Sequence, residues 1–388
     1  MASAWRYLRH WGGSSANAAN TTKYEALPAE ESQNQSTDSR DSRDSRAFRT
    51  SRSKRWRLFP RQKRTATILF LIDVGIVVFL VCALEPLITL LGRNEELFSP
   101  RLTLHDVGPA PPSQPGAQHK IPRILHQTTA NETIPEKWIK PQQSCKDVYS
   151  DYEYKLWTDE GARDFLSREY PWFIESWDNY AFPIQRADAI RYFVLHHYGG
   201  IYLDMDTFCN QTFPMHEVEN DDASPHIAVF KSTVPTGVTN DLMISSLRHP
   251  AFAIAIAQLP SYFAATRFWA EILPYVNIML SSGPLFLSLV VKDYLLQQDA
   301  LPSPSVTVIE PVNLNPYITD LESSTWHRSD ARLLMWLGKR PWAWFTLGAI
   351  GVAAGLLIFN YLLLVIYRAL AHNLSSVSFN FNKQAKVA

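Results

Sequence analysis

One segment carries most of the structural information in this chain: Gln185-Arg-Ala-Asp-Ala-Ile-Arg-Tyr-Phe-Val-Leu-His-His-Tyr-Gly-Gly-Ile-Tyr-Leu-Asp-Met-Asp206. Its apolar residues recur at helical spacing and predict an amphipathic helix over 184–198. Gly199-Gly200 ends this helix, and Ile201-Tyr202-Leu203 then forms a short apolar strand. A helix that passes through a glycine turn into a buried strand predicts a layered α/β domain.

Segments before this one support the same architecture. Residues 121–127 (Ile-Pro-Arg-Ile-Leu-His-Gln) predict a buried strand, and 153–158 predict a second with alternating aromatic residues. Residues 159–169 predict a helix that either Thr158 or Asp159 caps. Strands and helices therefore alternate along this part of the chain.

Two carboxylates, Asp204 and Asp206, directly follow the apolar strand. Successive side chains of a strand point to opposite faces, but a sharp turn could bring both acids to one place. There they would suit a hard divalent cation, with phosphate oxygens and water as further ligands. An isolated Asp-x-Asp pair is more often a pair of solvated turn residues. Here the context favours a site, because Asp188 and Arg191 share a helix face just upstream; the alternative for these two is an ordinary surface ion pair.

Composition excludes some classes of partner. The 388 residues include 37 Lys and Arg and 37 Asp and Glu, so the formal net charge is zero and nothing favours binding to nucleic acid. The chain has three cysteines. Cys82 lies in an apolar run, while Cys145 and Cys209 either form a disulfide or remain two buried thiols.

Two apolar runs, 66–91 and 342–367, are long enough to cross a bilayer. The basic segment 49–64 before the first run places the N-terminus in the cytosol. With two spans, residues 93–340 would be lumenal, where the acceptor sequences that begin at Asn131 and Asn210 could be glycosylated. A third apolar stretch, 268–291, contains Glu271, Pro274 and Gly283, and is interpreted as core or as a membrane-touching face.

These observations divide the chain into six parts. They are a disordered cytosolic tail (1–64), a transmembrane helix (66–91), a stem linker (92–119), a catalytic domain (120–335), a second transmembrane helix (342–367) and a cytosolic tail (368–388).

The helix–Gly-Gly–strand–Asp-x-Asp run resembles the glycosyltransferases of family 32. The motifs Ile121-Pro-Arg-Ile-Leu-His-Gln, Ile134-Pro-Glu-Lys-Trp and Tyr154-Lys-Leu-Trp-Thr-Asp-Glu do so as well, and the similarity covers about residues 120–330. The resemblance implies an α/β domain of the GT-A type, which uses nucleotide-diphospho-sugar donors, flanked here by two transmembrane helices. It also implies Mn²⁺ or Mg²⁺ and retention of the anomeric configuration.

Within that family, the chain is most similar to the fungal mannosyltransferases that act on inositol phosphorylceramide. The cues are the second span and Leu273-Pro-Tyr-Val followed by Ser282-Gly-Pro-Leu-Phe-Leu. The resemblance implies GDP-mannose as donor, a membrane lipid acceptor, a Golgi membrane location and a membrane regulatory subunit, for which Asp73 in the first span is a candidate contact. Two alternatives stay open: an N-glycan outer-chain α-mannosyltransferase and a non-catalytic membrane subunit.

The resemblance also assigns roles to individual residues. Asp206 and, more loosely, Asp204 would bind the metal, with His327 as a further ligand or else a structural histidine. Arg191 would lie near the phosphates or the sugar, and Asp188 would accept hydrogen bonds from sugar hydroxyls. Three more residues are candidates for donor contact or for simple packing: His126, Gln127 and Trp326. No Asp or Glu is marked by the sequence as a covalent nucleophile.

Overall fold

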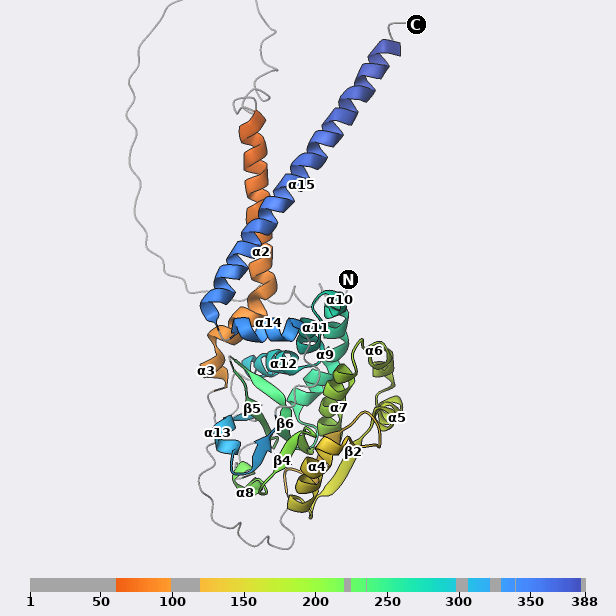
Figure 1. Cartoon of the computed structure of the whole chain (residues 1–388), viewed down its shortest axis with the longest axis vertical. Helices are drawn as coiled ribbons and strands as arrows, with labels where there is room; N and C mark the ends of the chain where they lie inside the picture. Colours follow the sequence, from red (N-terminus) through yellow and green to blue (C-terminus); the bar gives the residue numbers. More distant parts are fainter. Residues whose placement is uncertain are drawn as a thin grey trace, which may run out of the picture. The chain divides into compact units, whose positions relative to one another are not determined.

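The computed structural model describes residues 61–98, 119–219, 225–234, 236–297, 306–321, 329–338 and 340–384. The chain divides into two units, 1–77 and 78–388. The described part of the first unit is the beginning of helix α2 (Arg61–Gly92). The second unit contains the sheet domain drawn in Figure 1. Two predicted site residues, Trp326 and His327, lie outside the described residues.

A six-stranded sheet in the order β2-β1-β3-β6-β5-β7 forms the centre of the domain. Strands β2, β1 and β3 are parallel, and β6 runs opposite to its neighbours β3 and β5, while β7 is parallel to β5. A second sheet pairs β4 with β8. The bounds are β1 (Ile124–Thr128), β2 (Glu153–Trp157), β3 (Gly200–Leu203), β4 (Thr207–Cys209), β5 (Ala228–Ser232), β6 (Val238–Ser245), β7 (Val306–Ile309) and β8 (Ile318–Asp320).

Helices surround the two sheets of the domain. They are α3 (Asn94–Leu97), α4 (Glu136–Val148), α5 (Asp159–Glu169), η3 (Pro171–Phe173), α6 (Ile174–Asp178), α7 (Pro183–Tyr198), α8 (Met215–Val218), α9 (Pro250–Thr266), α10 (Trp269–Ile272), α11 (Pro274–Ser281), α12 (Pro284–Leu296), α13 (Pro311–Leu314) and α14 (Ser329–Gly338).

The predicted strands and helices of the central segment are confirmed. Helix α7 and strand β3 have nearly the predicted bounds, whereas β1 begins at Ile124, three residues later than expected. Helix α5 has the predicted bounds, and the Thr158 hydroxyl caps it by accepting a hydrogen bond from the Gly161 N–H at 3.0 Å.

The two faces of the sheet are buried under different helices. On β3, Tyr202 packs into one hydrophobic core with residues of α7, α9 and α12, while Ile201 and Leu203 pack into another with residues of α4, α8 and α13. This alternation follows from the two-residue period of a strand. It places the α7 face of the sheet, which carries Arg191, on the same side as Tyr202.

The glycine pair between α7 and β3 has a steric role. Both residues have positive φ angles, 66° at Gly199 and 98° at Gly200, a region that glycine enters without a Cβ clash. A Cβ on Gly200 would lie 2.5 Å from the carbonyl oxygen of Ile124 on β1. The glycines therefore let β3 pair closely with β1 directly after a helix.

Cys145 on α4 and Cys209 on β4 form a disulfide with a Cα–Cα distance of 4.8 Å. The structure thus selects the disulfide from the two alternatives that the sequence left open. Disulfides persist in oxidising compartments and are rare in the cytosol.

Two helices have the length and composition of membrane spans, at 63–92 and 342–370, and the most apolar window of each is not buried within the protein. The second lies in α15 (Pro341–Gln384). The apolar stretch at 274–296 also qualifies by composition, but 61% of its most apolar window is buried. It forms α11 and α12, and the residues of α12 belong largely to the core, as one of the two interpretations of this stretch predicted.

The region just after the first candidate span packs on the domain. Leu90 and Phe98 are 1% and 2% exposed and belong to the same core as α7 and α12. The Asn94 side-chain carbonyl accepts hydrogen bonds from the Gly237 N–H at 2.9 Å and from the Thr236 hydroxyl at 2.7 Å. The residues that directly follow the first candidate span therefore pack on the sheet domain.

Candidate active site

The predicted acids lie where the three parallel strands end. Thr128 is the last residue of β1, Trp157 the last of β2, and Asp204 directly follows β3. In open α/β sheets, ligands bind in the crevice beyond the carboxyl ends of such strands. A cavity of about 510 Å³ lies there, and both Asp204 and Asp206 line it. The pair therefore faces a cavity and does not decorate an exposed loop.

The walls of this cavity are rich in aromatic and small polar side chains. Trp138, Trp157 and Trp177 contribute large flat surfaces, and Thr128 and Asp159 contribute oxygen atoms. Flat aromatic faces with a few polar groups suit a ligand that contains a base or a sugar ring.

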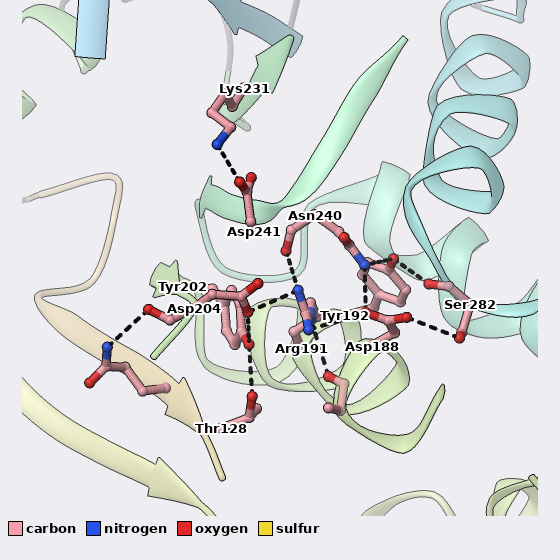
Figure 2. A network of polar contacts seen from close by, with 12 residues as sticks. Thr128, Asp188, Arg191, Tyr192, Tyr202, Asp204, Lys231, Asn240, Asp241 and Ser282 are labelled. Carbon is pink, nitrogen blue, oxygen red and sulfur yellow. Dashed lines mark hydrogen bonds and ion pairs between the residues drawn. The ribbon is translucent and has the colours of Figure 1, made fainter. Parts of the chain in front are cut away.

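Arg191 is the cationic centre of the site (Figure 2). Its guanidinium lies 3.1 Å from a carboxylate oxygen of Asp188 and 3.1 Å from one of Asp204. It also donates to the backbone carbonyl of Asn240 at 2.6 Å, and its Cζ lies 4.7 Å from the centre of the Tyr202 ring. Although its side chain is only 3% exposed, Arg191 lines the cavity. These contacts fix a permanent positive charge at the cavity wall.

Asp188 lies behind Arg191 and is 4% exposed. Its carboxylate accepts hydrogen bonds from the Asn240 side-chain amide at 2.9 Å and from the Ser282 hydroxyl at 3.4 Å. The same amide also donates to the Tyr192 hydroxyl, which in turn donates to the Ser282 carbonyl at 2.6 Å. In this state Asp188 holds Arg191 in place, and its predicted contact with a sugar hydroxyl stays a prediction.

Asp204 is oriented by hydroxyl groups from the strands. The Tyr202 hydroxyl donates to Asp204 at 2.7 Å and itself lies 2.8 Å from the Thr128 hydroxyl. With 29% of its side chain exposed, Asp204 still reaches the cavity. Asp206 is also partly exposed, and its backbone carbonyl accepts the Leu321 N–H at 3.0 Å, which ties the acid turn to the end of β8.

The charged groups of the site perturb one another. Burial raises the pKa of Asp204 to about 7; Arg191 opposes this, while Asp241 and Asp206 add to it. Burial also raises the pKa of Asp188 to about 6, again against the effect of Arg191. Burial lowers the pKa of Arg191, but Asp204, Tyr202 and Asp188 outweigh it and keep this side chain protonated. Negative charge is therefore held here at a cost, which an additional cation would reduce.

The acid pair fits a divalent metal, although it does not complete a coordination shell. Within the described ranges no three His, Cys, Asp or Glu side chains are grouped closely enough to hold an ion. Two carboxylates at a cavity wall are nevertheless the oxygen ligands that Mg²⁺ or Mn²⁺ uses together with substrate phosphates and water. Asp204 and Asp206 could hold such an ion only jointly with a ligand or with residues outside the described ranges.

His126 and Gln127 lie beneath the cavity and do not line it. Both are fully buried. The His126 ring contacts the Gly199 carbonyl at 2.9 Å and accepts the Trp157 indole N–H at 3.1 Å, and burial lowers its pKa to about 4. Gln127 accepts the Tyr154 hydroxyl at 2.9 Å. These contacts match the alternative of satisfied core polar groups that support the strand ends.

The sequence did not point to several members of this network. Asn240 and Asp241 lie on β6, the antiparallel strand beside β3, and no local sequence motif predicts that they reach the site. Lys231 from β5 forms an ion pair with Asp241 and a second with Asp320 at 3.0 Å. Long-range pairing of β3 with β6 brings these residues to the site, and a single sequence contains little signal for such pairing.

Comparisons with known proteins identify related sequences. Residues 135–225 match the family model described as a glycosyltransferase sugar-binding region containing a DXD motif. The mannosyl phosphorylinositol ceramide synthase SUR1 of Saccharomyces cerevisiae is 40% identical over 234 residues, which cover 59% of this chain and 57% of that protein. Inositol phosphoceramide mannosyltransferase 1 of Schizosaccharomyces pombe is 34% identical over 255 residues, covering 64% and 74%.

The coverage of these relatives is incomplete. The chain spans between 55% and 62% of the length of the first four curated relatives that it matches. Among solved structures, the ligand-free glycosyltransferase domain from the YGT toxin has 8% identity and a TM-score of 0.36, covering 57% of this chain and 86% of that one, which is too distant to support an argument. On its sequence relatives and its Asp-x-Asp site, the chain belongs to glycosyltransferase family 32, together with the inositol phosphoceramide mannosyltransferases.

Proposed function

We propose that this protein transfers mannose from GDP-mannose to inositol phosphorylceramide, with retention of configuration and with the help of Mn²⁺ or Mg²⁺. The names of the relatives from Saccharomyces cerevisiae and Schizosaccharomyces pombe supply the acceptor class. The observation that carries the proposal is structural: Asp204, Asp206 and Arg191 line one cavity at the carboxyl ends of the parallel strands.

The charges of the site suit departure of a nucleoside diphosphate. When bound to Asp204 and Asp206, a divalent ion would neutralise negative charge on the leaving phosphates. Arg191 supplies a second, fixed positive charge, and its carboxylate and carbonyl partners spare it from reorganising during the reaction. Asp188 positions Arg191 through their ion pair, and its carboxylate is proposed to accept a hydrogen bond from a sugar hydroxyl.

His327 is proposed as a further ligand because of its place in the chain. It follows Leu321 by six residues, and the Leu321 N–H is bonded to the Asp206 carbonyl. Six residues can span up to about 20 Å, so the imidazole can reach the acid pair. Trp326, directly before it, is proposed to stack on the donor.

The membrane arrangement is part of the proposal. Two candidate spans would make the protein multi-pass, and the Cys145–Cys209 disulfide supports an oxidising, lumenal compartment such as the Golgi for the domain. Asn131 and Asn210 are both exposed, as glycosylation in that compartment would require. The domain boundaries are proposed accordingly, with the catalytic domain at 120–335.

A transfer assay tests the activity. The full-length protein in detergent micelles is given GDP-mannose and inositol phosphorylceramide, and mannosylated lipid is quantified with Mn²⁺ or with a chelator. We expect Asp206→Asn to lower kcat/KM by about 100- to 1000-fold, the usual effect of removing one electrostatic stabilising group. The control is Asp178→Asn, an exposed acid paired with Arg163. Full activity in the chelator or in Asp206→Asn would exclude the proposed metal site.

An N-glycan acceptor is the alternative within the same chemistry. The initiation-specific α-1,6-mannosyltransferase of Saccharomyces cerevisiae is 25% identical to this chain over 179 residues. Offering both acceptors in one competition assay separates the two functions, since the mannosylated product is either a lipid or an oligosaccharide.

A membrane regulatory subunit is proposed as a partner, with Asp73 in the first span as a contact. If that subunit still co-purified normally with the Asp73→Leu variant, the proposed contact at Asp73 would be excluded. The purified chain could lack activity with every acceptor, and neither added metal nor an added partner could restore it. That result would favour the interpretation as a non-catalytic subunit.

A further inference from the structure

Two short helices expose a concentration of large apolar side chains. Phe268, just before α10, and Ile272, its last residue, are 61% and 60% exposed. On α14, Leu333, Met335 and Trp336 are 59%, 42% and 48% exposed. Elsewhere on the described domain, exposed large apolar residues are dispersed over different elements, as is normal for a soluble surface. A concentration such as this one marks an interaction surface.

The two helices belong to one end of the domain, together with α11 (Figure 1). Helix α10 is separated from α11 by Leu273 alone. The Asp330 carboxylate at the start of α14 accepts the N–H of Tyr275 in the first turn of α11 at 2.7 Å. Helix α14 buries Ala331 and Leu337 but exposes Leu333, Met335 and Trp336, which lie between them in the chain.

The covalent structure identifies what this surface faces. Helix α14 ends at Gly338, and α15 begins at Pro341 with an apolar window from Trp342 onward that is long enough to cross a bilayer. Arg340, between the two, lies with its guanidinium 4.4 Å from the centre of the Trp336 ring. Tryptophan and arginine at the end of a span are typical of the lipid headgroup region.

The first candidate span ends at the same part of the domain. The Lys292 ammonium on α12 donates to the Pro86 carbonyl at 3.3 Å, and Leu90 is buried in the core that α12 helps to form. Helix α12 directly follows α11 in the chain. Both spans are thus joined to the group of helices that exposes the apolar side chains.

We propose that Phe268, Ile272, Leu333, Met335 and Trp336 form a membrane-docking surface that inserts into the lipid interface beside the two spans. Apolar side chains of such surfaces enter the boundary between headgroups and acyl chains by about 5–10 Å. Burial of these side chains by lipid removes the apolar exposure that the domain would otherwise present to water. The surface is independent of the identity of the sugar donor and acceptor.

Site-directed fluorescence on the full-length chain tests the proposal. In a Cys82→Ser background, which removes the free cysteine, single Ile272→Cys and Leu333→Cys variants are labelled with an environment-sensitive nitrobenzoxadiazole dye; Cys145 and Cys209 are disulfide-bonded. The purified protein is reconstituted in phosphatidylcholine vesicles with or without doxyl-labelled lipid. The matched control is Ile139→Cys on α4, an apolar residue that is 49% exposed.

At positions 272 and 333, insertion to the depth typical of interfacial helices should allow doxyl lipid to lower the emission by about twofold or more. Iodide in the water should quench these two positions at least about fivefold less than position 139. Equal iodide quenching at all three positions would overturn the proposal. Protection of positions 272 and 333 from iodide in native membranes, but not in vesicles of the purified chain, would also overturn the proposal. A protein partner would then cover the surface. All three sites are exposed, so the substitutions should leave the fold intact.

Discussion

Arg191 and Lys292 are both buried cations, and each has 3% of its side chain exposed, yet their surroundings differ. Arg191 has two carboxylate partners, Asp188 and Asp204, and donates to two backbone carbonyls. Lys292 has one carboxylate partner, Asp293 at 3.0 Å, and one carbonyl partner, that of Pro86. The first cation lies at the cavity, and the second lies where the end of α2 meets α12.

The difference shows that two equally buried cations can have different roles, one in a binding site and one in a contact between helices. At Arg191 the acids outnumber the base, and Asp204 and Asp206 still reach the cavity, so the site holds negative charge ready for another cation. At Lys292 the single acid is 35% exposed and can be solvated without its partner. Lys292 therefore completes the contact between the end of α2 and α12, which is called the joint below. Arg191, in contrast, belongs to a site whose acids can bind a further cation.

The largest expected effect is the loss of unfolding free energy when Arg191 is replaced. Arg191→Met leaves Asp188 and Asp204 without their positive partner, and breaking a buried ion pair costs about 3–5 kcal/mol. Lys292→Met should cost only about 1 kcal/mol, the value of an ordinary hydrogen bond. Urea unfolding of the detergent-solubilised protein, followed by tryptophan fluorescence, measures both. Equal losses would mean that the two cations have the same structural role.

Activity should separate the cations further. Arg191→Lys keeps the charge but loses the planar, multiple contacts of the guanidinium, so we expect kcat/KM for the proposed mannosyl transfer to fall by about 100-fold or more. Lys292→Arg, the reciprocal exchange, should change it by less than about twofold because Lys292 does not line the cavity. A comparable loss in the two variants would contradict the assignment of Arg191 to the site.

The raised pKa of Asp204 predicts a pH dependence. Below about pH 7 the carboxyl holds a proton that a metal ion must displace, so Mn²⁺ affinity should rise by up to about tenfold per pH unit from pH 5 to 7 and then level off. Since the folded state binds this proton more tightly, the free energy of unfolding of the metal-free protein should decrease over the same range. Isothermal titration calorimetry at pH 5, 6, 7 and 8 measures the affinity. Asp204→Asn should flatten its pH dependence, and an unchanged slope in that variant would assign the proton to another group.

A smaller effect than at Arg191 is expected at the joint beside Lys292. Asn94→Ala removes the acceptor for the Gly237 N–H and the Thr236 hydroxyl, which should lower the free energy of unfolding by about 1–2 kcal/mol. Transfer activity should be retained. Asn179→Ala, which removes only an exposed local hydrogen bond to Glu175, is the control for the same measurement. If Asn94→Ala abolished activity without a loss of stability, the joint would have a catalytic role as well.

Local sequence patterns predicted the centre of the fold well. Helical periodicity, the glycine pair and the apolar strand defined α7 and β3, and two of the predicted acids do line a cavity with Arg191. Patterns of this kind succeed because periodicity and turn chemistry depend on neighbouring residues. Asn240, Lys231 and the order of the sheet could not be predicted in this way, because antiparallel β6 joins the site only through pairing between distant segments.

The hydrogen bond from the Gly237 N–H to Asn94 holds the residues that directly follow the first candidate span against the sheet domain. If that span crosses the membrane as proposed, the domain samples the bilayer surface and not the surrounding volume. For a lipid acceptor, its rate would then depend on the mole fraction of that lipid in the membrane. Diluting the acceptor with inert lipid should slow the reaction, whereas adding more vesicles of the same composition should leave the turnover of each protein molecule unchanged.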